Sequence, residues 1–354
     1  GAEGRRVFAL PARHQDEAGN ITTEEEVAPL ENTTVAQAVH NNGGIVIVQV
    51  KKVVAHGSLD PRLVTIPGIY VDYVVVADEG DHEQAFGCKF DPTLCGDRRA
   101  PEDTGGEALP LSAKKIIGRR GALMLKEDVV VNLGVGVPEY VAAVAGEEGI
   151  ADDFTLTVEN GAIGGVPQGG ALFGSARNAD AFVAQDYQFD FYDGAGLDMA
   201  FLGLAQCDEK GNINVSRFGP RIAGCGGFVH ISQMTPNVFF CGTFTNGSLK
   251  VAVENGEVKI LQEGKSNKFV KSVDQVTFNG EYATKMHKNV WYITERCVFK
   301  LTDKGLKLTE VAPGVNVEKD ILAHMDFKPI VEDYTTMDTR IFSESLMGLK
   351  NRNI

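Results

Sequence analysis

The sequence contains no long hydrophobic run. None of its stretches reaches the roughly 18 consecutive apolar residues of a membrane-spanning helix, so we expect no membrane span and no membrane partner. The first six residues, Gly1 to Arg6, include no apolar segment of the kind that a signal peptide needs. They also lack an initiating methionine, and we therefore expect a processed or truncated N-terminus.

Positive charge is scarce. The chain has 34 lysine and arginine residues against 48 aspartate and glutamate residues, a formal net charge of −14 at pH 7. Nucleic-acid binding requires a basic face, so a nucleic acid is not expected as a partner. A small anion is still compatible with this charge, because helix N-termini and backbone amides bind phosphate or carboxylate locally.

Paired cysteines are absent as well. No two of the six cysteines form a C-x-x-C pair, since they stand at positions 88, 95, 207, 225, 241 and 297. This spacing excludes the usual zinc sites and a dense disulfide framework, and no metal is expected. We expect reduced thiols and a cytoplasmic location.

Glycine, by contrast, is abundant: it accounts for 40 of the 354 residues, where an average protein has about 7%. The glycines gather in short clusters beside apolar runs, as expected where the backbone approaches a ligand. Hydrophobic residues make up 43% and charged residues 23%, the balance of a globular protein, and the length suits two domains.

Apolar runs divide the chain into two α/β parts. In residues 1–76 we expect a helix at Val35–His40 and buried strands at Ile45–Val50 and Tyr70–Val76. Residues 77–112, rich in Asp, Glu, Gly and Pro, are typical of a linker. A second domain over residues 113–345 follows, with a tail at 346–354.

The second domain is predicted to begin with a helix from Ser112, a good N-cap, to Lys126. A strand at Val129–Val131, a helix starting near Pro138 and a strand at Phe154–Val158 complete its alternating part. Strands dominate the rest, at Met199–Leu204, Val238–Phe244, Val273–Phe278, Val290–Ile293 and Leu306–Val311. This order predicts an open α/β sheet with a β-rich extension.

Three clusters in this domain carry the candidate chemistry. The first, Asn132–Glu139, places Gly134, Val135 and Gly136 between a strand and a helix. Amides at a helix N-terminus favour negative charge. The cluster lacks the third glycine of a dinucleotide fingerprint and the Gly-Lys-Ser/Thr of a P-loop, and a glycine turn needed only for backbone geometry is the alternative.

The second cluster is Glu159-Asn160-Gly161, which follows the strand at Phe154–Val158. Ligands of open α/β sheets bind at the carboxyl ends of strands, so this position favours a functional carboxylate. Asn-Gly is also the strongest short hairpin signal, and a glutamate before it can simply be solvated. The spacing alone leaves both interpretations open.

The third cluster is Gly224-Cys225-Gly226-Gly227, which follows a hairpin-like segment with Gly211-Asn212 at its turn. Three glycines in four positions favour amides directed at a ligand or an oxyanion. Cys225 has the chemistry of a nucleophile. The sequence nevertheless favours a small buried thiol in a tight turn at this position.

Taken together, the three clusters resemble the family I coenzyme A (CoA) transferases. That family carries N-L-G-[IV]-G-[IV]-P, then Glu-Asn-Gly or Glu-x-Gly, then Gly-x-Gly-Gly, and all three occur here in this order. The likeness runs from about Gly19 to Lys350. It is greatest to the propionate (lactate, acetate) CoA-transferases of anaerobic bacteria, which resemble this chain at Gly57–Arg62, Tyr187–Gly194 and Asn212–Ser216.

The resemblance implies the family's fold, an open-sheet α/β fold of the NagB/RpiA-like kind. It assigns residues 1–76 to the later part of a first CoA-transferase domain whose beginning this chain lacks, and residues 113–345 to the second, catalytic domain. The segment before Gly19, including Phe8–Pro11, matches the family poorly. A homo-oligomer is expected from the family, and another chain could supply the missing N-terminal half.

The resemblance also implies a reaction, the transfer of CoA between short carboxylic acids without a metal. Glu159 would attack an acyl-CoA, forming a mixed anhydride and then a glutamyl-CoA thioester, with ping-pong kinetics. The residues implied in CoA or oxyanion binding are Gly134, Val135, Gly136, Asn160, Gly161, Gly224, Gly226 and Gly227. Two alternatives stay open: a truncated CoA-binding chain that is inactive without its N-terminal half, and a sugar-phosphate isomerase-like enzyme on a similar fold.

Overall fold

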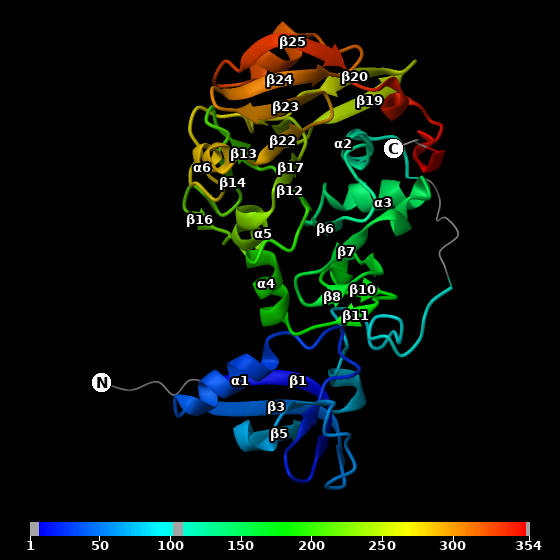
Figure 1. The fold of residues 1–354 in the computed structure, drawn as a ribbon, viewed down its shortest axis with the longest axis vertical. Coiled ribbons are helices and arrows are strands. Elements are labelled where there is room, and N and C mark those ends of the chain that lie inside the picture. The colour runs from blue at the N-terminus through cyan, green and yellow to red at the C-terminus, as the bar shows by residue number, and fades with distance from the viewer. Residues whose placement is uncertain (1–6, 102–108, 352–354) are drawn as a thin grey trace. The chain divides into compact units, whose positions relative to one another are not determined.

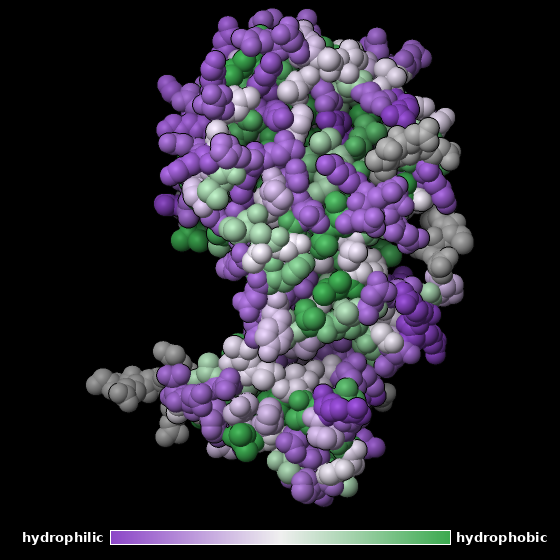
Figure 2. All heavy atoms as spheres, in the orientation of Figure 1, coloured by the Kyte–Doolittle hydropathy of each residue, from purple (hydrophilic) through white to green (hydrophobic). Residues whose placement is uncertain are grey.

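The computed structural model describes residues 7–101 and 109–351 (Figure 1). The chain divides into two compact units, and each unit is built from two segments of the sequence. The first unit comprises Gly1–Glu102 and Leu156–Asp190, and the second comprises Asp103–Thr155 and Phe191–Ile354. Hydrophilic side chains cover much of the visible surface, with hydrophobic residues in smaller groups between them (Figure 2).

The first unit contains a five-stranded sheet with strand order β4-β2-β1-β3-β5. Its strands are β1 (Val7–Asp16), β2 (Ile21–Thr22), β3 (Ile45–Val54), β4 (Val64–Ile66) and β5 (Tyr73–Val76). Strands β1, β3 and β5 are parallel, and β2 and β4 pair antiparallel at one side. The predicted strand at 45–50 is confirmed, whereas the second strand begins at Tyr73 because Gly68–Tyr70 form a 3-10 turn.

Helix α1 (Asn32–Asn41) confirms the helix predicted at 35–40. It contributes Ala36 to a core formed with Leu10, Val46 and Val48 from the central strands. The opposite face of the sheet is open, with Val7 58%, Tyr73 61% and Val75 51% exposed. Parallel sheets usually bury both faces, so this open face is unusual.

Strand β1 was not expected from the sequence, because its segment matched the family poorly and contains a proline. Pro11 cannot donate a ladder hydrogen bond, which normally restricts proline to strand edges. In the structure Pro11 lies opposite Gln49 in a parallel ladder of nine residue pairs between β1 and β3. The neighbouring β2 pairs with β1 only at His14 and Gln15. No residue of β2 therefore requires a ladder hydrogen bond from Pro11, which has no N–H to donate.

The second segment of the first unit is a set of short hairpins. Strands β7 (Thr155–Thr157), β8 (Ala162–Ile163) and β11 (Ala181–Phe182) pair antiparallel, as do β9 (Val166–Pro167) and β10 (Ala176–Arg177). The chain passes from the second unit into the first within β7, and returns within helix α4 (Gln185–Asp193).

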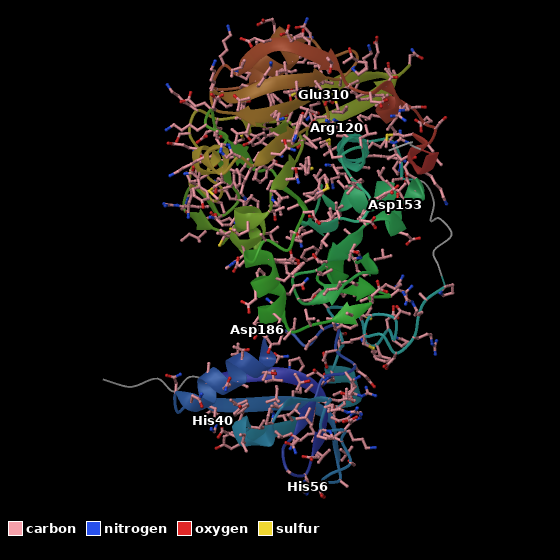
Figure 3. All side chains as sticks on the ribbon, viewed as in Figure 1. His40, His56, Arg120, Asp153, Asp186 and Glu310 are labelled. Carbon is pink, nitrogen blue, oxygen red and sulfur yellow. The ribbon has the colours of Figure 1, made fainter. Side chains whose placement is uncertain are left out.

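Polar contacts join the two segments of the first unit. The Thr34 hydroxyl of α1 donates a hydrogen bond to Asp186 of α4 at 2.6 Å (Figure 3). The Arg177 guanidinium pairs with Asp91 at 3.3 Å, and the Asn178 side chain exchanges hydrogen bonds with the backbone of Ala100. These contacts fix the loop between residues 83 and 101 against β10.

The second unit contains parallel strands β6 (Val130–Leu133), β12 (Met199–Gly203), β17 (Asn237–Cys241) and β22 (Asn289–Ile293). Antiparallel strands β23 (Cys297–Thr302) and β24 (Gly305–Val311) extend it, and β25 (Ile330–Thr336) ends it parallel to β24. Its helices are α2 (Ala113–Ala122), α3 (Glu139–Glu147), α5 (Phe228–Met234) and α6 (Gly280–Lys285). The predicted open α/β sheet with a β-rich extension is confirmed.

Short antiparallel pairs complete the second unit. They are β13 (Gln206–Cys207) with β14 (Ile213–Asn214), β15 (Arg217–Phe218) with β16 (Arg221–Ile222), β18 (Thr245–Asn246) with β21 (Ser266–Asn267), and β19 (Lys250–Glu254) with β20 (Glu257–Gln262). The first pair confirms the hairpin expected around Gly211-Asn212.

The helix predicted from Ser112 is found but is shorter than expected, and the strand predicted at Val273–Phe278 is not found. Ser112 caps α2 as expected, since its hydroxyl accepts a hydrogen bond from the Lys115 amide at 3.2 Å, but the helix ends at Ala122. The strand predicted at Val273–Phe278 is wrong. This segment is a loop that makes a single isolated bridge, between Phe278 and Ile213; Val273 and Phe278 are buried, whereas Val276 is 50% exposed. Burial alone, without a ladder partner, does not make a strand.

Helix α2 is anchored to the extension of the sheet by an ion pair. Arg120 donates two hydrogen bonds to the Glu310 carboxylate of β24, at 2.8 and 2.6 Å (Figure 3). The paired geometry of a guanidinium and a carboxylate adds directional specificity to the charge attraction.

A buried charge network lies where the parallel part of the second unit meets its extension. Arg296 and Glu295 are fully buried and joined at 2.6 Å. The Arg296 guanidinium also donates to Glu263 at 2.8 Å and to the Asp320 carbonyl at 2.8 Å. The other carboxylate oxygen of Glu295 accepts the Phe244 amide at 2.8 Å.

We predict that Arg296→Leu lowers the free energy of unfolding of the second unit by about 3–5 kcal/mol, because it strands buried carboxylates without a counter-charge. Urea unfolding followed by the fluorescence of Trp291 on β22 measures this change. The matched control is Lys259→Met, which removes an exposed pair with Glu257 and should cost less than about 1 kcal/mol. Equal costs for the two variants would contradict the prediction.

Glu263 should make stability sensitive to acid. Burial alone would raise the pKa of its carboxyl, but hydrogen bonds from Arg296 and Thr245 outweigh burial and lower the pKa to about 2. The unfolded chain therefore takes up this proton near pH 4.5 while the folded chain does not, and stability is lost as pH falls from 4.5 toward 2. The stability gap between the wild type and Glu263→Gln should narrow over this range, and a constant gap would refute the assignment.

Candidate active site

Glu159 lies in the tight turn between β7 and β8. The Gly161 amide donates to the Val158 carbonyl at 3.0 Å, and the Val158 amide donates to Ala162 at 2.9 Å. The hairpin indicated by Asn-Gly is therefore confirmed, and Glu159 stands on it half-buried. A small core beneath the turn, with Val158, Ala162 and Ala176 buried, holds its shape.

Position 161 of this turn requires a glycine. Its φ of +117° lies where side chains other than glycine are strained. A Cβ at this position would also come within 1.8 Å of the Val183 carbonyl, which is fixed by a hydrogen bond between the Val183 amide and the Gly161 carbonyl at 2.9 Å. Backbone conformation and space together require glycine beside Glu159.

The side chains around Glu159 support the turn. The buried Asn160 amide donates to the Gly174 carbonyl, which ties the turn to the loop before β10. Gln188 of α4, 1% exposed, donates to the Val158 carbonyl at 3.3 Å. Gln188 belongs to the family-like segment Tyr187–Gly194, but the sequence did not assign it a role, because its contact with Val158 spans 30 residues of chain.

The loop after β6 lies in the second unit. The Gly134 amide donates to the Phe201 carbonyl of β12 at 2.8 Å, and the Gly136 amide donates to the Glu139 carboxylate at 2.9 Å. These two amides are therefore engaged inside the protein. Val135 between them is 62% exposed, and no hydrogen bond from its amide is found in the described part of the chain. Glu139 is a second residue that the sequence did not single out.

The loop of Gly224–Gly227 leads into α5, with Gly227 as its N-cap. The Gly224 amide donates to the Ser216 carbonyl at 3.1 Å, which fastens the start of the loop to the preceding hairpin. Gly224 and Gly226 have positive φ, and a Cβ on either would meet no atom within 4 Å. The space beside them is open. The prediction of a buried Cys225 thiol is wrong, since this residue is exposed.

The two glycine loops share one side of the second unit's sheet. The first loop follows the carboxyl end of β6 directly. The second precedes α5, which returns the chain to the start of β17, a strand parallel to β6. Ligands of open α/β sheets bind on this carboxyl side. The structure thus groups the Gly134–Gly136 and Gly224–Gly227 loops in the second unit, and Glu159, Asn160 and Gly161 in the first.

These elements offer a carboxylate for covalent chemistry in the first unit and backbone amides for anions in the second. Within residues 7–101 and 109–351 there is no group of three or more His, Cys, Asp or Glu side chains arranged to hold a metal ion. Among the helices described, none is long and apolar enough to cross a membrane.

Comparison with known proteins finds relatives of this chain. The family model for coenzyme A transferase matches residues 3–77. The caffeate CoA-transferase of Acetobacterium woodii is 45% identical over 350 residues, which cover 97% of this chain and 66% of that protein. The acetate CoA-transferase YdiF of Escherichia coli O157:H7 is 44% identical over 335 residues, or 94% of this chain and 62% of that protein.

The solved structure of the E. coli O157:H7 acyl-CoA transferase YdiF, a thioester complex with CoA, has the same fold. It matches with a TM-score of 0.90 and 41% identity over 97% of this chain and 64% of that chain. The fold is thus that of a CoA-transferase, as expected. The chain belongs to the coenzyme A transferase family. It spans between 62% and 66% of the length of these relatives.

We predict that Gly161→Ala destabilises the hairpin of Glu159 by about 2–4 kcal/mol, because it adds both φ strain and a clash with the backbone of Val183. Hydrogen–deuterium exchange of the β7–β8 amides measures the local stability. The matched control is Gly170→Ala, where φ is +62° but no atom lies within 4 Å of the added Cβ, so only about 1 kcal/mol of backbone strain is expected. Equal exchange in both variants would show that the clash is relieved without cost.

Proposed function

We propose that this chain carries the catalytic carboxylate of a CoA-transferase and that this carboxylate is Glu159. The main support is its position on a rigid turn at the end of β7, where Gly161 and the Asn160 contact to Gly174 hold the backbone. Additional support comes from the YdiF structure, whose description as a thioester complex with CoA matches the covalent intermediate that this role requires.

The reaction exchanges one thioester for another and therefore needs no external energy source. The Glu159 carboxylate attacks the carbonyl carbon of an acyl-CoA, the C–S bond breaks, and a mixed anhydride and the CoA thiolate form. The thiolate then attacks the Glu159 carbonyl, which releases the first acid and leaves a glutamyl-CoA thioester. A second acid reverses these steps and departs as a new acyl-CoA, so the kinetics are ping-pong.

Each step passes through a tetrahedral oxyanion, which needs hydrogen-bond donors already in place. The candidates are the backbone amides of Val135 and of Gly226 and Gly227. The Gly134 and Gly136 amides are less suited to this role because both already donate within the protein. Loss of one oxyanion donor costs typically about 2.7–4 kcal/mol of transition-state stabilisation.

The acids exchanged are proposed from the relatives. Acetate is the acid in the name of YdiF and caffeate the acid in the name of the A. woodii enzyme. Propionate and lactate remain part of the proposal on the sequence motifs alone. A pocket that accepts one or two more methylene groups differs by only about 1–3 kcal/mol in binding, so the acid specificity is set by fine differences.

The proposal extends to the domain boundaries, the oligomeric state and the location of the protein. We place residues 1–76 in the later part of a first CoA-transferase domain, a linker at 77–112, the second domain at 113–345 and a tail at 346–354. A homo-oligomer is proposed from the family resemblance. A cytoplasmic location is proposed because all six cysteines carry free thiols.

The experiment is mass spectrometry after incubation with acetyl-CoA. A CoA-sized adduct should appear on the peptide that contains Glu159, and Glu159→Gln should abolish it. The matched control is Glu127→Gln, an exposed glutamate of the second unit, which should keep the adduct. An adduct on another residue, or one that survives Glu159→Gln, would refute the assignment.

A second candidate function is binding of CoA without turnover. It is favoured by the observation that this chain spans only 62% to 66% of the length of its relatives. Two arms separate the candidates: the chain alone, and the chain supplemented with the part of the A. woodii enzyme that it does not match. Turnover by the chain alone contradicts the second candidate, and an adduct only in the supplemented arm supports dependence on that part. The isomerase alternative finds no support in the named relatives.

A further inference from the structure

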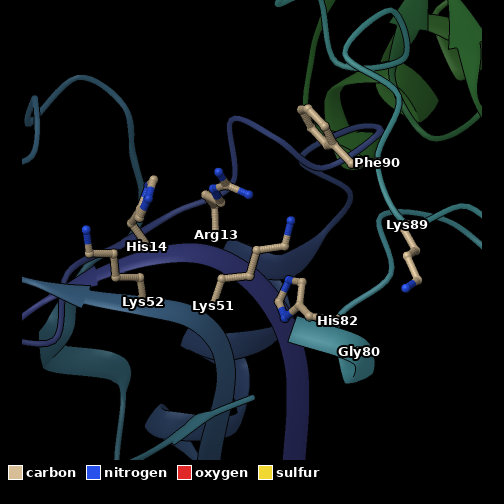
Figure 4. Close-up of a pocket in the computed structure, with 8 residues that line it drawn as sticks. All are labelled: Arg13, His14, Lys51, Lys52, Gly80, His82, Lys89 and Phe90. Atoms are coloured by element: carbon tan, nitrogen blue, oxygen red, sulfur yellow. The ribbon is translucent and has the colours of Figure 1, made fainter. Parts of the chain in front are cut away.

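A strongly basic pocket of about 600 Å³ lies in the first unit (Figure 4). It stands near the carboxyl ends of the parallel strands β1 and β3, where His14 lies opposite Lys52. The carboxyl ends of parallel strands are the usual place for ligands in α/β sheets. The lining residues are Arg13, His14, Lys51, Lys52, Gly80, His82, Lys89 and Phe90.

The lining gathers four permanent cations in a chain whose net charge is −14, and it includes no carboxylate. Acidic side chains stand next to it: Glu25 pairs with Arg13 and lies 3.5 Å from Lys51, and Glu24 pairs with His14 at 3.1 Å. Neither Lys52 nor Lys89 pairs with a carboxylate in the described part of the chain, so these two cations are not neutralised by an ion pair. Coulomb repulsion among the cations opposes this arrangement unless an anion joins them.

Two buried polar atoms of residues that line the pocket make no hydrogen bond within the described part of the chain. His82 is 4% exposed, and its Nε2 makes no hydrogen bond, although Glu26 Oε1 lies 3.5 Å away. The Arg13 Nε is buried and unbonded as well. Buried polar groups without partners are costly, so each such atom marks a place where a ligand would supply the missing contact.

Burial and neighbouring charges shift the pKa values of His82 and Glu26. Burial lowers the pKa of His82, and the Lys51 and Arg13 cations lower it further. Burial raises the pKa of Glu26 to about 7, although the Lys51 cation opposes this shift. An anion in the pocket would offset the effect of the two cations on His82.

The chemistry of the lining favours a phosphate group. A phosphomonoester carries close to two negative charges and three acceptor oxygens, which suits a lining with several Lys and Arg donors better than a single carboxylate does. Phe90 forms an apolar wall, with Lys51 5.3 Å and Arg13 5.9 Å from its ring centre. The volume exceeds that of free phosphate and lies within the range of small-molecule sites, so the group should be part of a larger organic molecule.

We propose that this pocket binds the phosphate group of a small phosphorylated organic molecule, with Arg13, Lys51 and Lys89 as its cationic ligands and His82 as a hydrogen-bond partner. The source of the phosphate is either CoA, whose ribose carries a 3′-phosphate, or an unrelated phosphomonoester. The site is independent of the role of Glu159, because binding is measured without turnover.

The test is isothermal titration of the chain with inorganic phosphate, CoA and dephospho-CoA, which lacks the 3′-phosphate. Lys89→Gln removes an exposed ligand with little risk to folding, and Lys51→Gln removes a half-buried one. Each should weaken phosphate binding roughly tenfold or more. The control is Arg62→Gln, an exposed cation of the same unit outside the pocket, which should leave binding unchanged. Circular dichroism verifies that the variants are folded.

The outcomes separate the sources. If CoA binds more tightly than dephospho-CoA and the Lys51 and Lys89 variants remove this difference, the pocket holds the 3′-phosphate of CoA. If the variants weaken the binding of inorganic phosphate but leave the difference in affinity between CoA and dephospho-CoA unchanged, the ligand is another phosphomonoester. The proposal is overturned if phosphate does not bind to the wild type, or if Arg62→Gln weakens binding as much as the two pocket variants do.

Discussion

The second unit depends on one buried cation, the guanidinium of Arg296. It connects the turn between β22 and β23 to Glu263 and to the Asp320 carbonyl, while its partner Glu295 holds the Phe244 amide. Four stretches of chain distant in sequence therefore meet at one point. Because a buried charge is tolerated only when fully paired, this point accepts few other arrangements of those stretches. The change from a parallel sheet to an antiparallel extension takes place directly beside it.

The residues predicted to act in catalysis lie on two kinds of backbone, one in each unit. The turn of Glu159 is crowded, since Val183 lies where any side chain at residue 161 would go, and Asn160 and Gln188 brace it from two sides. The loop of Gly224–Gly227 is fastened at its start, yet it has free space beside its glycines. A nucleophile gains from a fixed position, whereas amides that receive a ligand need room for that ligand. The crowded turn and the open loop suit these two different needs.

Much of this organisation could be predicted from local patterns. The apolar run at 45–50, the Ser112 cap and the Asn-Gly turn each depend on residues close in sequence, and all three are found in the structure. Strand β1 could not be predicted, because its stability comes from pairing with a strand some forty residues away. The same holds for the loop at 273–278, the exposure of Cys225 and the convergence of Arg13 and His82. These features depend on tertiary contacts, which local spacing does not encode.

The open face of the first unit's sheet affects how the chain behaves in solution. Val7, Tyr73 and Val75 present an apolar surface on parallel strands, and such surfaces associate with one another or with a partner. The net charge of −14 opposes association between copies at low ionic strength. Added salt shortens the reach of this repulsion to about 8 Å near physiological strength but leaves the apolar attraction in place. Higher ionic strength therefore weakens the electrostatic barrier to contact between such apolar faces.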